Sequence, residues 1–191
     1  MQMESLSDAA LMKRVRNRDV DAFQVLYSRY ESRIFNFLLR YVGNRPLAED
    51  LLQETFWRVW QAAASFQADR GEFRAWLYRV ALNLVRTEMA HKRYGLDRLA
   101  PEQQSESAGT LQTDREHDPA DRLERQETAT LVEKALSGLS ASMREVIVLK
   151  CLEGMKFSEI ASVTGTPEGT LKSRFHRAIA ELRRRLIPGE R

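Results

Sequence analysis

The sequence is poor in cysteine, in proline and glycine, and in long apolar runs. Its single cysteine, Cys151, excludes an internal disulfide and fits a reducing compartment. With only nine glycines and five prolines beside 43% hydrophobic and 30% charged residues, the composition favours a helical globular protein. No apolar run approaches the roughly 20 residues of a membrane span, and the first residues do not have the order of a signal peptide. We therefore expect a cytoplasmic protein.

The sequence also lacks the spacings that catalysis or cofactor binding requires. His91, His117 and His176 belong to different predicted elements, and Cys151 has no Cys or His at metal-ligand spacing. A phosphate loop and a dinucleotide-binding fingerprint are missing as well. We therefore expect a protein that is not an enzyme and that has no cofactor or metal.

Charge is distributed unevenly along the chain, although the net charge is only +3. Residues 1–97 carry 15 Lys and Arg against 12 Asp and Glu, residues 98–126 carry 4 against 7, and residues 127–191 carry 11 against 8. Six basic residues and a single acid, Glu181, fall within 170–187. Such a basic element indicates a polyanion partner, usually nucleic acid, although a solvated helix face would carry the same charge.

Helical periodicity covers two parts of the chain and stops between them. The intervening stretch is polar, acidic and poor in aromatic residues, which is typical of a linker. We predict an all-α protein with two small helical domains joined by a flexible acidic linker. The predicted ranges are 1–95 for the first domain, 96–120 for the linker and 121–191 for the second domain.

In the first domain, cap and turn residues predict where helices begin and end. Ser7 is suited to cap a short helix, and Asp21 to begin a longer helix that ends at Gly43. Pro46 suits the first turn of the next helix.

That next helix, 48–64, has an unusual outer face. One side gathers an apolar stripe that is expected to enter the core. The opposite side places Trp57 among Asp50, Gln53 and Glu54. Trp57 either packs on a neighbouring helix or is an exposed anchor for a protein partner with an acidic surround.

A following helix, 73–94, is predicted to carry a cationic and amide stripe. Arg79, Asn83 and Arg86 fall on one side of its helical wheel, away from the apolar residues. Trp76 lies at the seam between the two faces. A tryptophan there is either part of the core edge or a surface on which unpaired bases stack.

The second domain has the pattern of a helix-turn-helix, in which the second helix of the pair enters the DNA major groove. Helices are predicted near 121–137 and 141–152, then over FSEIASVT and over the basic segment that follows Pro167, with Gly154 and Gly165 in the turns. The wheel of the last helix turns its apolar residues inward, namely Leu171, Phe175, Ala178, Ile179, Leu182 and Leu186. Small hydroxyls and arginines on the opposite side suit contacts with base edges and phosphates.

Three blocks of the sequence are specific in combination. They are AEDLLQETFWRVW at 48–60, FRAWLYRVALNLV at 73–85 and GLSASMREVIVLKCLEGMKFSEIASVTGTPEGTLKSRFHRAIAELRRRL at 138–186. In this order they resemble the conserved blocks of extracytoplasmic-function (ECF) sigma factors, the small two-domain branch of the sigma-70 family. Thr164 departs from the large aliphatic residue that is usual there, which predicts a more loosely packed turn.

The resemblance implies that three surfaces bind the transcription machinery. Core RNA polymerase would be bound through its beta-prime clamp helices and its beta subunit, the minus-10 promoter element as unpaired bases, and the minus-35 element as duplex. The implied core-polymerase-binding residues are Asp50, Gln53, Glu54 and Trp57. The implied minus-10 residues are Arg79, Asn83, Arg86 and Trp76, with the SFQADRGE loop before them. The implied minus-35 residues are Thr170, Lys172, Ser173, Arg174 and Arg177.

The resemblance further implies a function in transcription initiation. Such a protein would promote promoter melting for a specialised stress or envelope regulon, and an anti-sigma factor, often membrane-anchored, would occlude its binding faces. The acidic linker would thread the polymerase cleft, or would serve only as a tether. Two other functions fit the residues alone: a stand-alone helix-turn-helix repressor or activator, and an interaction protein that has a basic helix but no sequence-dependent DNA binding.

Overall fold

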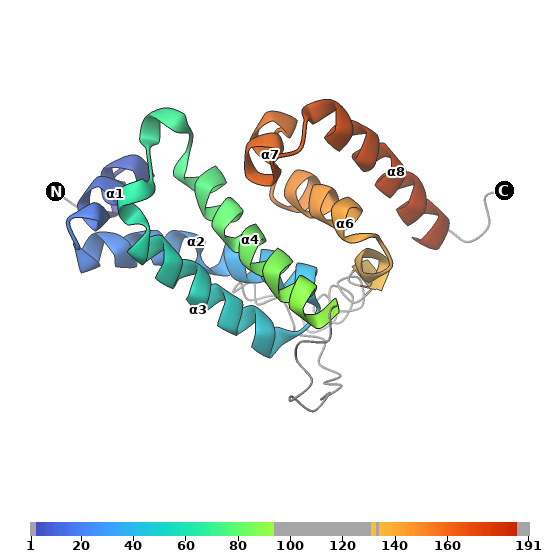
Figure 1. Cartoon of the computed structure of the whole chain (residues 1–191), viewed down its shortest axis with the longest axis horizontal. Helices are drawn as coiled ribbons and strands as arrows, with labels where there is room; N and C mark the ends of the chain where they lie inside the picture. Colours follow the sequence, from blue (N-terminus) through green and yellow to red (C-terminus); the bar gives the residue numbers. More distant parts are fainter. Residues whose placement is uncertain (1–2, 94–130, 133, 187–191) are drawn as a thin grey trace, which may run out of the picture.

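The computed structural model describes residues 3–93, 131–132 and 134–186, and over these ranges the chain contains helices and turns but no strand (Figure 1). The prediction of an all-α fold is thus confirmed. The first group of helices comprises α1 (Asp8–Arg16), α2 (Val20–Val42), α3 (Arg45–Gln61) and α4 (Phe73–Arg93), with short 3-10 turns at Met3–Ser5, Ala63–Ser65 and Ala68–Arg70. The second group comprises α6 (Ala141–Ile147), the π-helix η4 (Val148–Leu152), α7 (Phe157–Thr164) and α8 (Glu168–Leu186).

The helix ends in the first group follow the local sequence closely. Ser7 caps α1, its Oγ accepting from the backbone N–H of Ala10 at 3.3 Å. The prediction that Asp21 begins α2 is wrong by one residue, because α2 begins at Val20 and its cap is Asp19, which accepts from Ala22 N–H at 3.0 Å. Gly43 ends α2 with φ +65°, a left-handed conformation that glycine adopts without the steric cost of a Cβ.

The core of the first group lies between α2, α3 and α4. Buried apolar side chains from all three helices interlock there, and aromatic rings meet edge to face, as in Phe37 with Tyr78 and Tyr30 with Phe73. Each fully buried Leu, Ile or Phe contributes roughly 1.5–3 kcal/mol of transfer free energy. This packing fixes which sides of α3 and α4 face outward.

The second group has the predicted succession of short helices, with one local difference. The segment predicted as one helix over 141–152 is α6 followed by the π-helix η4, and Gly154 turns the chain at φ +67°. Of the helix predicted near 121–137, residues 131–132 and 134–137 are described and are helical. The predicted linker lies outside the described residues.

The turn between α7 and α8 is closed by a side chain. Gly165 ends α7 at φ +70°, and Thr164, which is buried, accepts a hydrogen bond on its Oγ1 from the N–H of Thr166 at 3.1 Å. This hydrogen bond holds the turn at Thr164, and the looser packing expected there stays a prediction. In α8, Leu171 and Ala178 are buried as predicted, but Leu186 is half exposed at the last residue of the helix.

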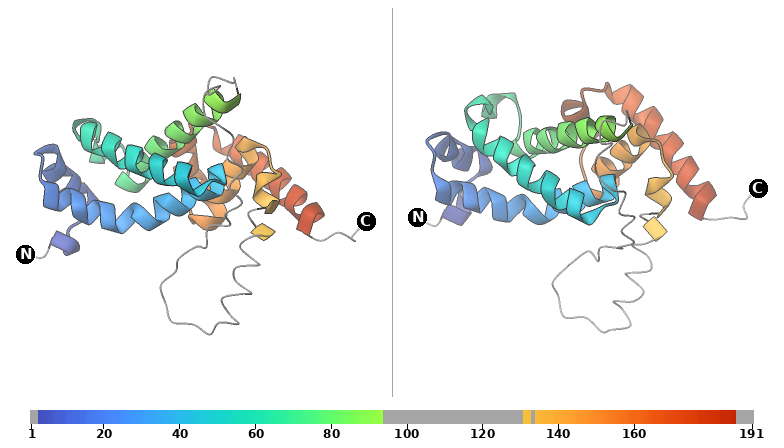
Figure 2. Two further views of the ribbon diagram at one scale, coloured as in Figure 1. Left: turned by 90° about the horizontal axis from the view of Figure 1, so that it is seen from below. Right: turned by 60° about the horizontal axis from the view of Figure 1, so that its bottom comes forward.

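The two groups pack against each other. Their buried residues belong to one contiguous apolar core, and α4 lies alongside α7 (Figures 1 and 2). None of the helices in the described ranges has the length and apolar character that crossing a membrane requires. The face of α4 that meets α7 is the one on which the sequence places Arg79 and Arg86.

Candidate nucleic-acid and protein interfaces

The outer face of α3 presents an exposed tryptophan among polar side chains. Leu52, Phe56 and Val59 are buried and so hold the helix in one orientation. On the opposite side 55% of Trp57 is accessible to solvent, and Asp50 and Gln53 are exposed beside it. The alternative that Trp57 packs on a neighbouring helix is thereby excluded.

The contacts of Glu54 and Trp60 show which large side chain on this helix remains available to a partner. Glu54 accepts from Arg58 Nε at 2.7 Å, an i,i+4 pair on the helix surface that is worth a few tenths of a kcal/mol at most. Trp60, by contrast, packs edge to face on Phe23 at 5.1 Å between ring centroids and is part of the core edge. Trp57 is therefore the large apolar group that this face offers to a partner.

The residues of the predicted stripe lie together on the side of α4 that faces away from the core of the first helix group. Leu77, Leu82, Leu84 and Val85 are buried, which leaves the side chains of the stripe, Arg79, Asn83 and Arg86, at the surface of the first helix group. We call these three residues the α4 stripe.

Trp76 lies at the edge of the α4 stripe and is half-buried. Its ring packs on Phe66 at 5.6 Å and on Phe73 at 6.1 Å between centroids. These contacts fix the ring at the core edge and leave its remaining surface facing outward. A role in stacking on a base stays a prediction.

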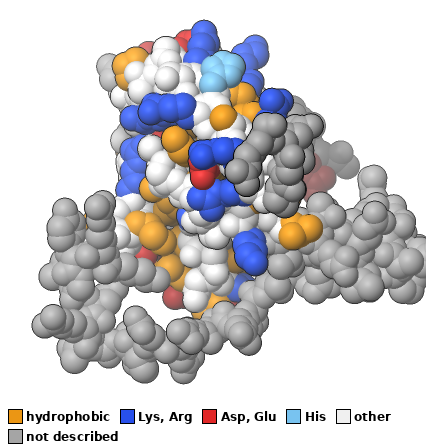
Figure 3. All heavy atoms as spheres, turned by 90° about the vertical axis from the view of Figure 1, so that its right-hand side faces the viewer, with side chains coloured by type: hydrophobic (Ala, Val, Ile, Leu, Met, Phe, Trp, Pro, Cys, Tyr) orange, Lys and Arg blue, Asp and Glu red, His pale blue; other side chains and the backbone are white. Residues whose placement is uncertain are grey.

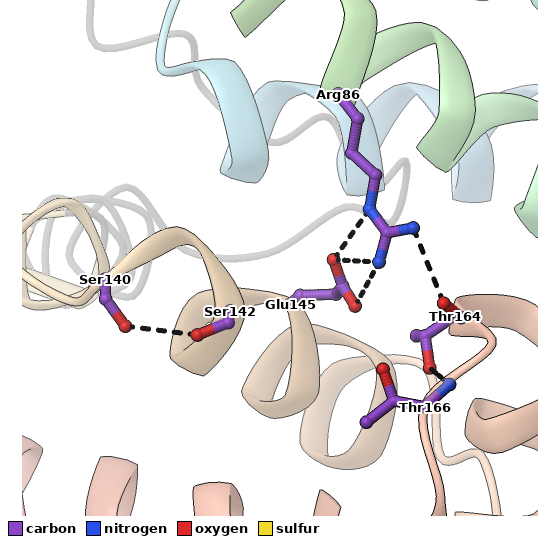
Figure 4. A network of polar contacts seen from close by, with 6 residues as sticks. All are labelled: Arg86, Ser140, Ser142, Glu145, Thr164 and Thr166. Carbon is purple, nitrogen blue, oxygen red and sulfur yellow. Dashed lines mark hydrogen bonds and ion pairs between the residues drawn. The ribbon is translucent and has the colours of Figure 1, made fainter. Parts of the chain in front are cut away.

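Both arginines of the α4 stripe contact the second helix group, and Figure 4 shows the contacts of Arg86. Arg86 Nη2 lies 2.9 Å from both carboxylate oxygens of Glu145, and its Nη1 lies 3.5 Å from the backbone carbonyl of Thr164. Arg79 Nη2 donates to the backbone carbonyl of Ser162 at 2.5 Å and lies 3.0 Å from its Oγ. Sequence periodicity placed these arginines on one side but could not show what they meet.

Burial changes the titration of the groups around this contact. Glu145 is only 3% exposed, and desolvation raises the pKa of its carboxyl, an effect that the nearby charge of Arg86 opposes. Desolvation also raises the pKa of Tyr41 to about 12, with the charge of Glu145 adding to the shift. The Glu145 ion pair therefore carries a desolvation cost that offsets much of its Coulomb attraction.

A second polar cluster joins the two groups at Glu153. Tyr78, which is fully buried, donates its hydroxyl to the Glu153 carboxylate, and Arg74 donates to the Glu153 backbone carbonyl. The sequence analysis did not identify this cluster, because Glu153 lies far along the chain from Tyr78 and Arg74. A buried tyrosine hydroxyl on α4 was the available signal, since it needs a hydrogen-bond partner.

The outward face of α8 carries the predicted duplex-reading residues. Thr170, Lys172, Ser173 and Arg177 are exposed, whereas Arg174 is half-buried. Lys172 lies 3.8 Å from Glu168, an exposed pair that solvent largely screens. Leu171 and Ala178 hold the helix against the core and so aim this face outward.

Basic side chains outnumber acidic ones on the face of the molecule that includes the C-terminal end of α8 (Figure 3). Arg184 and Arg185 both contact Glu181, and Arg185 lies 2.9 Å from it. Arg183 is exposed. Across the described ranges no group of three or more His, Cys, Asp or Glu side chains could hold a metal ion.

Comparison with known proteins identifies both helix groups. Residues 26–94 match the model of sigma-70 region 2, and residues 129–182 match the model of sigma-70 region 4. The ECF RNA polymerase sigma-E factor of Haemophilus influenzae is 30% identical over 188 residues, covering 97% of this chain and 98% of the relative. The sigma-E factor of Escherichia coli is 31% identical over 180 residues, covering 92% of each.

Solved structures agree with the sequence comparison. The protein is similar to CnrH, solved in complex with the cytosolic domain of CnrY, with a TM-score of 0.70, 27% identity and coverage of 96% of this chain and 99% of the other. It is also similar to the sigma factor RpoE of Bartonella quintana, solved with the anti-sigma factor NepR, with a TM-score of 0.69, 25% identity and coverage of 88% and 98%. A stand-alone helix-turn-helix regulator would not match sigma-70 regions in both halves. The chain belongs to the sigma-70 family and is an ECF RNA polymerase sigma factor.

Proposed function

We propose that this sigma factor divides its work among three surfaces, and that it acts in the cytoplasm without catalysing a reaction itself. The observation that carries the proposal is the separation of an exposed apolar anchor, Trp57, from two basic faces on α4 and α8. A protein partner recognises the first kind of surface and nucleic acid the second. The proposed domain division is the one predicted from the sequence, at 1–95, 96–120 and 121–191.

The face of α3 is the proposed docking site for core RNA polymerase, with Asp50, Gln53, Glu54 and Trp57 as its contacts. A tryptophan that is half exposed buries a large area when a partner covers it. The acids around it favour a basic partner and exclude DNA through like-charge repulsion.

The α4 stripe is the proposed site for the minus-10 element, with Trp76 at its edge. Opening a duplex requires neutralisation of its backbone and a surface on which extruded bases stack, but no chemistry on the DNA. Arg79 and Arg86 supply positive charge, the amide of Asn83 can hydrogen-bond to a base edge, and Trp76 supplies an aromatic ring.

The outward face of α8 is the proposed reader of the minus-35 element as duplex DNA. Its contacts are Thr170, Lys172, Ser173, Arg174 and Arg177. Short hydroxyl side chains near the helix start permit close approach to the groove, and arginine can bind guanine with two hydrogen bonds.

We also propose that an anti-sigma factor regulates the protein by covering these faces, and that the controlled genes serve a stress or envelope response. The similar structures of CnrH and of RpoE support this proposal, because each was solved with a second protein, CnrY and the anti-sigma factor NepR respectively. A surface that must be accessible to polymerase and DNA is also available to such an inhibitor.

The division of labour is tested with holoenzyme on a promoter that has been selected by transcription from a library. Asn83→Ala should preserve binding to the closed duplex and reduce the permanganate reactivity of minus-10 thymines. Ser173→Ala should reduce recruitment to the closed duplex and leave transcription from DNA with a preformed bubble unchanged. Identical profiles for the two variants would contradict the proposal.

A further inference from the structure

A cavity of about 400 Å³ lies where α2 and α4 meet the end of η4. It is lined by three arginines and an amide from the first helix group and by two residues of the second group, namely Arg33, Asn36, Arg40, Arg74, Leu152 and Glu153. None of them belongs to the three surfaces proposed to contact polymerase or promoter DNA. A small organic molecule fits such a space, because ligand cavities in proteins have volumes of roughly 300–1,000 Å³.

The side chains that line this cavity have a surplus of positive charge. Three arginines against one glutamate leave two positive charges without a counter-charge in the lining. The Glu153 carboxylate is itself engaged, because it accepts from the buried Tyr78 hydroxyl and lies 4.0 Å from Arg40 Nη1. The charges of the other two arginines are therefore available to an anion.

Arg33 and Arg74 are those two arginines, and neither forms an ion pair within the part of the chain that the structure describes. Arg74 is held in place, since it donates to the backbone carbonyl of Glu153 and lies 5.9 Å from the centroid of the Tyr78 ring. Its Nε is buried and has no hydrogen-bond partner among the described residues. A buried N–H group without an acceptor is costly, and an oxygen bound against Arg74 removes that cost.

This set of groups favours phosphate oxygens, and several phosphates close together. The planar fork of a guanidinium matches a phosphate with two hydrogen bonds. A diphosphate gathers its charges in a small volume, whereas a nucleic-acid backbone spreads one charge per phosphate along an extended chain. The Asn36 amide can donate to and accept from a sugar or base, and Leu152, which is 39% exposed, offers an apolar contact.

We propose that this cavity is a binding site for a small organic polyphosphate of the nucleoside diphosphate class. The arginines of α2 and α4 bind the phosphates, and the end of η4 completes the wall. The bound phosphates neutralise the surplus charge of the lining. The site is separate from the proposed polymerase and DNA contacts, so the chain can bind such a ligand through residues that have no other assigned role.

Calorimetric titration of the full-length free protein tests the site with ADP, GDP, inorganic pyrophosphate and inorganic phosphate. Physiological salt is used, since it screens non-specific association. Both nucleotides and pyrophosphate should bind about tenfold or more tightly than phosphate, because further phosphate oxygens add charge-assisted hydrogen bonds. The tighter of the two nucleotides should exceed pyrophosphate in affinity, and it should raise the melting temperature of the protein.

Arg33→Gln is the decisive variant, because this arginine is exposed and its loss breaks no ion pair among the described residues. It should weaken nucleotide binding about tenfold. Arg16→Gln is the matched control, with the same charge change at an exposed position on α1 that does not line the cavity, and its affinity should equal that of the wild type.

Arg74→Lys tests the geometry, since it keeps the positive charge but removes Nε and the planar fork. Nucleotide affinity should again fall, and the melting temperature without ligand shows whether the variant folds. If it does not fold, Arg33→Gln and its control decide the question.

Nucleotides and pyrophosphate that bind no more tightly than phosphate would overturn the proposed site. Equal nucleotide affinity of Arg33→Gln and Arg16→Gln would overturn it as well. So would binding of a short single-stranded DNA that depends on Arg33 while ADP, GDP and pyrophosphate do not bind, since these arginines would then serve a nucleic-acid backbone. Each of these results leaves the proposed function intact, because the cavity shares no residue with the surfaces on which that function rests.

Discussion

Trp57 is the proposed anchor for core polymerase. Because the side chain is 55% exposed, Trp57→Ala should leave the free energy of unfolding within about 0.5 kcal/mol of the wild type. It should weaken binding to core polymerase by about 2 kcal/mol or more, as an interface anchor does when it is truncated. Titration of labelled core polymerase with each variant measures the loss.

Leu186→Ala is the matched control, since this apolar side chain is also exposed, at the end of α8. Its affinity for core polymerase should equal that of the wild type. Equal losses in the two variants would show that Trp57 has no special part in docking.

The buried carboxyl of Glu145 should make the free energy of unfolding depend on pH. Charged or titratable groups face it from three elements, namely Arg86 on α4, Tyr41 on α2 and Arg174 on α8, yet burial dominates and raises its pKa. The native state therefore binds this proton more tightly than the unfolded state, so the Glu145 contribution is fully present at low pH and is lost as pH rises through the native pKa.

Lowering the pH from about 7 to about 5 should thus stabilise the wild type relative to Glu145→Gln, which has no such proton to bind. Urea denaturation of both proteins at the two pH values measures the difference. A wild type that loses stability relative to the Gln variant on acidification would mean that Arg86 outweighs burial.

Prediction from sequence succeeds or fails residue by residue for definite reasons. Ser7 and Gly43 were identified correctly because capping is a local interaction. The local pattern indicates Asp21 as the start of α2, whereas Asp19 is the cap, since either aspartate suits a helix start. The alternatives for Trp57 needed the packing of other helices to be resolved.

At the scale of elements, the turn before α8 depends on one glycine. Gly165 has φ +70°, so Gly165→Ala should destabilise the fold by about 1 kcal/mol or more. Gly169 lies within the first turn of α8, and a Cβ there would meet no atom within 4 Å. Gly169→Ala should therefore stabilise the helix by roughly 0.5–1 kcal/mol.

Thermal or urea unfolding of the two variants gives this comparison directly. Opposite signs are expected from the same chemical change, because only Gly165 has a left-handed backbone. A destabilised Gly169→Ala protein would mean that the start of α8 is under a constraint that its backbone does not reveal.

In α8 we expect one arginine to contribute to sequence-specific recognition and another to contribute only to non-specific binding of phosphates. Arg177→Ala should cost about 1–3 kcal/mol in promoter recognition by holoenzyme and relax specificity at one base pair, while binding to core polymerase is unchanged. Arg183→Ala should instead weaken binding to all sequences alike and reduce the salt dependence by about one phosphate contact. Binding isotherms at several salt concentrations, on matched and mismatched promoters, distinguish the two outcomes.

Element type was more predictable than element detail. The apolar periodicity of α8 correctly predicted that Leu171 and Ala178 are buried, because one side of an amphipathic helix must face a core. The π-helix η4 was predicted as an ordinary end of α6, since the shift from i+4 to i+5 hydrogen bonds leaves no periodic signal over five residues.

At the scale of the whole molecule, the sequence predicted two helical domains but not their contact. Arg79 and Arg86 fell on one stripe from periodicity alone, whereas their partners Ser162 and Glu145 lie in another part of the chain. Pairing across such a distance follows from tertiary structure, which helical wheels do not contain. The compact arrangement of the described residues is therefore the main finding that only the structure supplies.

The central claim, that this chain directs RNA polymerase to promoters, is tested most directly by multi-round transcription. Purified core polymerase and a library of promoter fragments are incubated with and without the full-length protein, and transcript 5′ ends are mapped. We predict new, sequence-specific start sites that depend on the protein and are lost in the Trp57→Ala variant. No specific start site with the wild-type protein would contradict the claim.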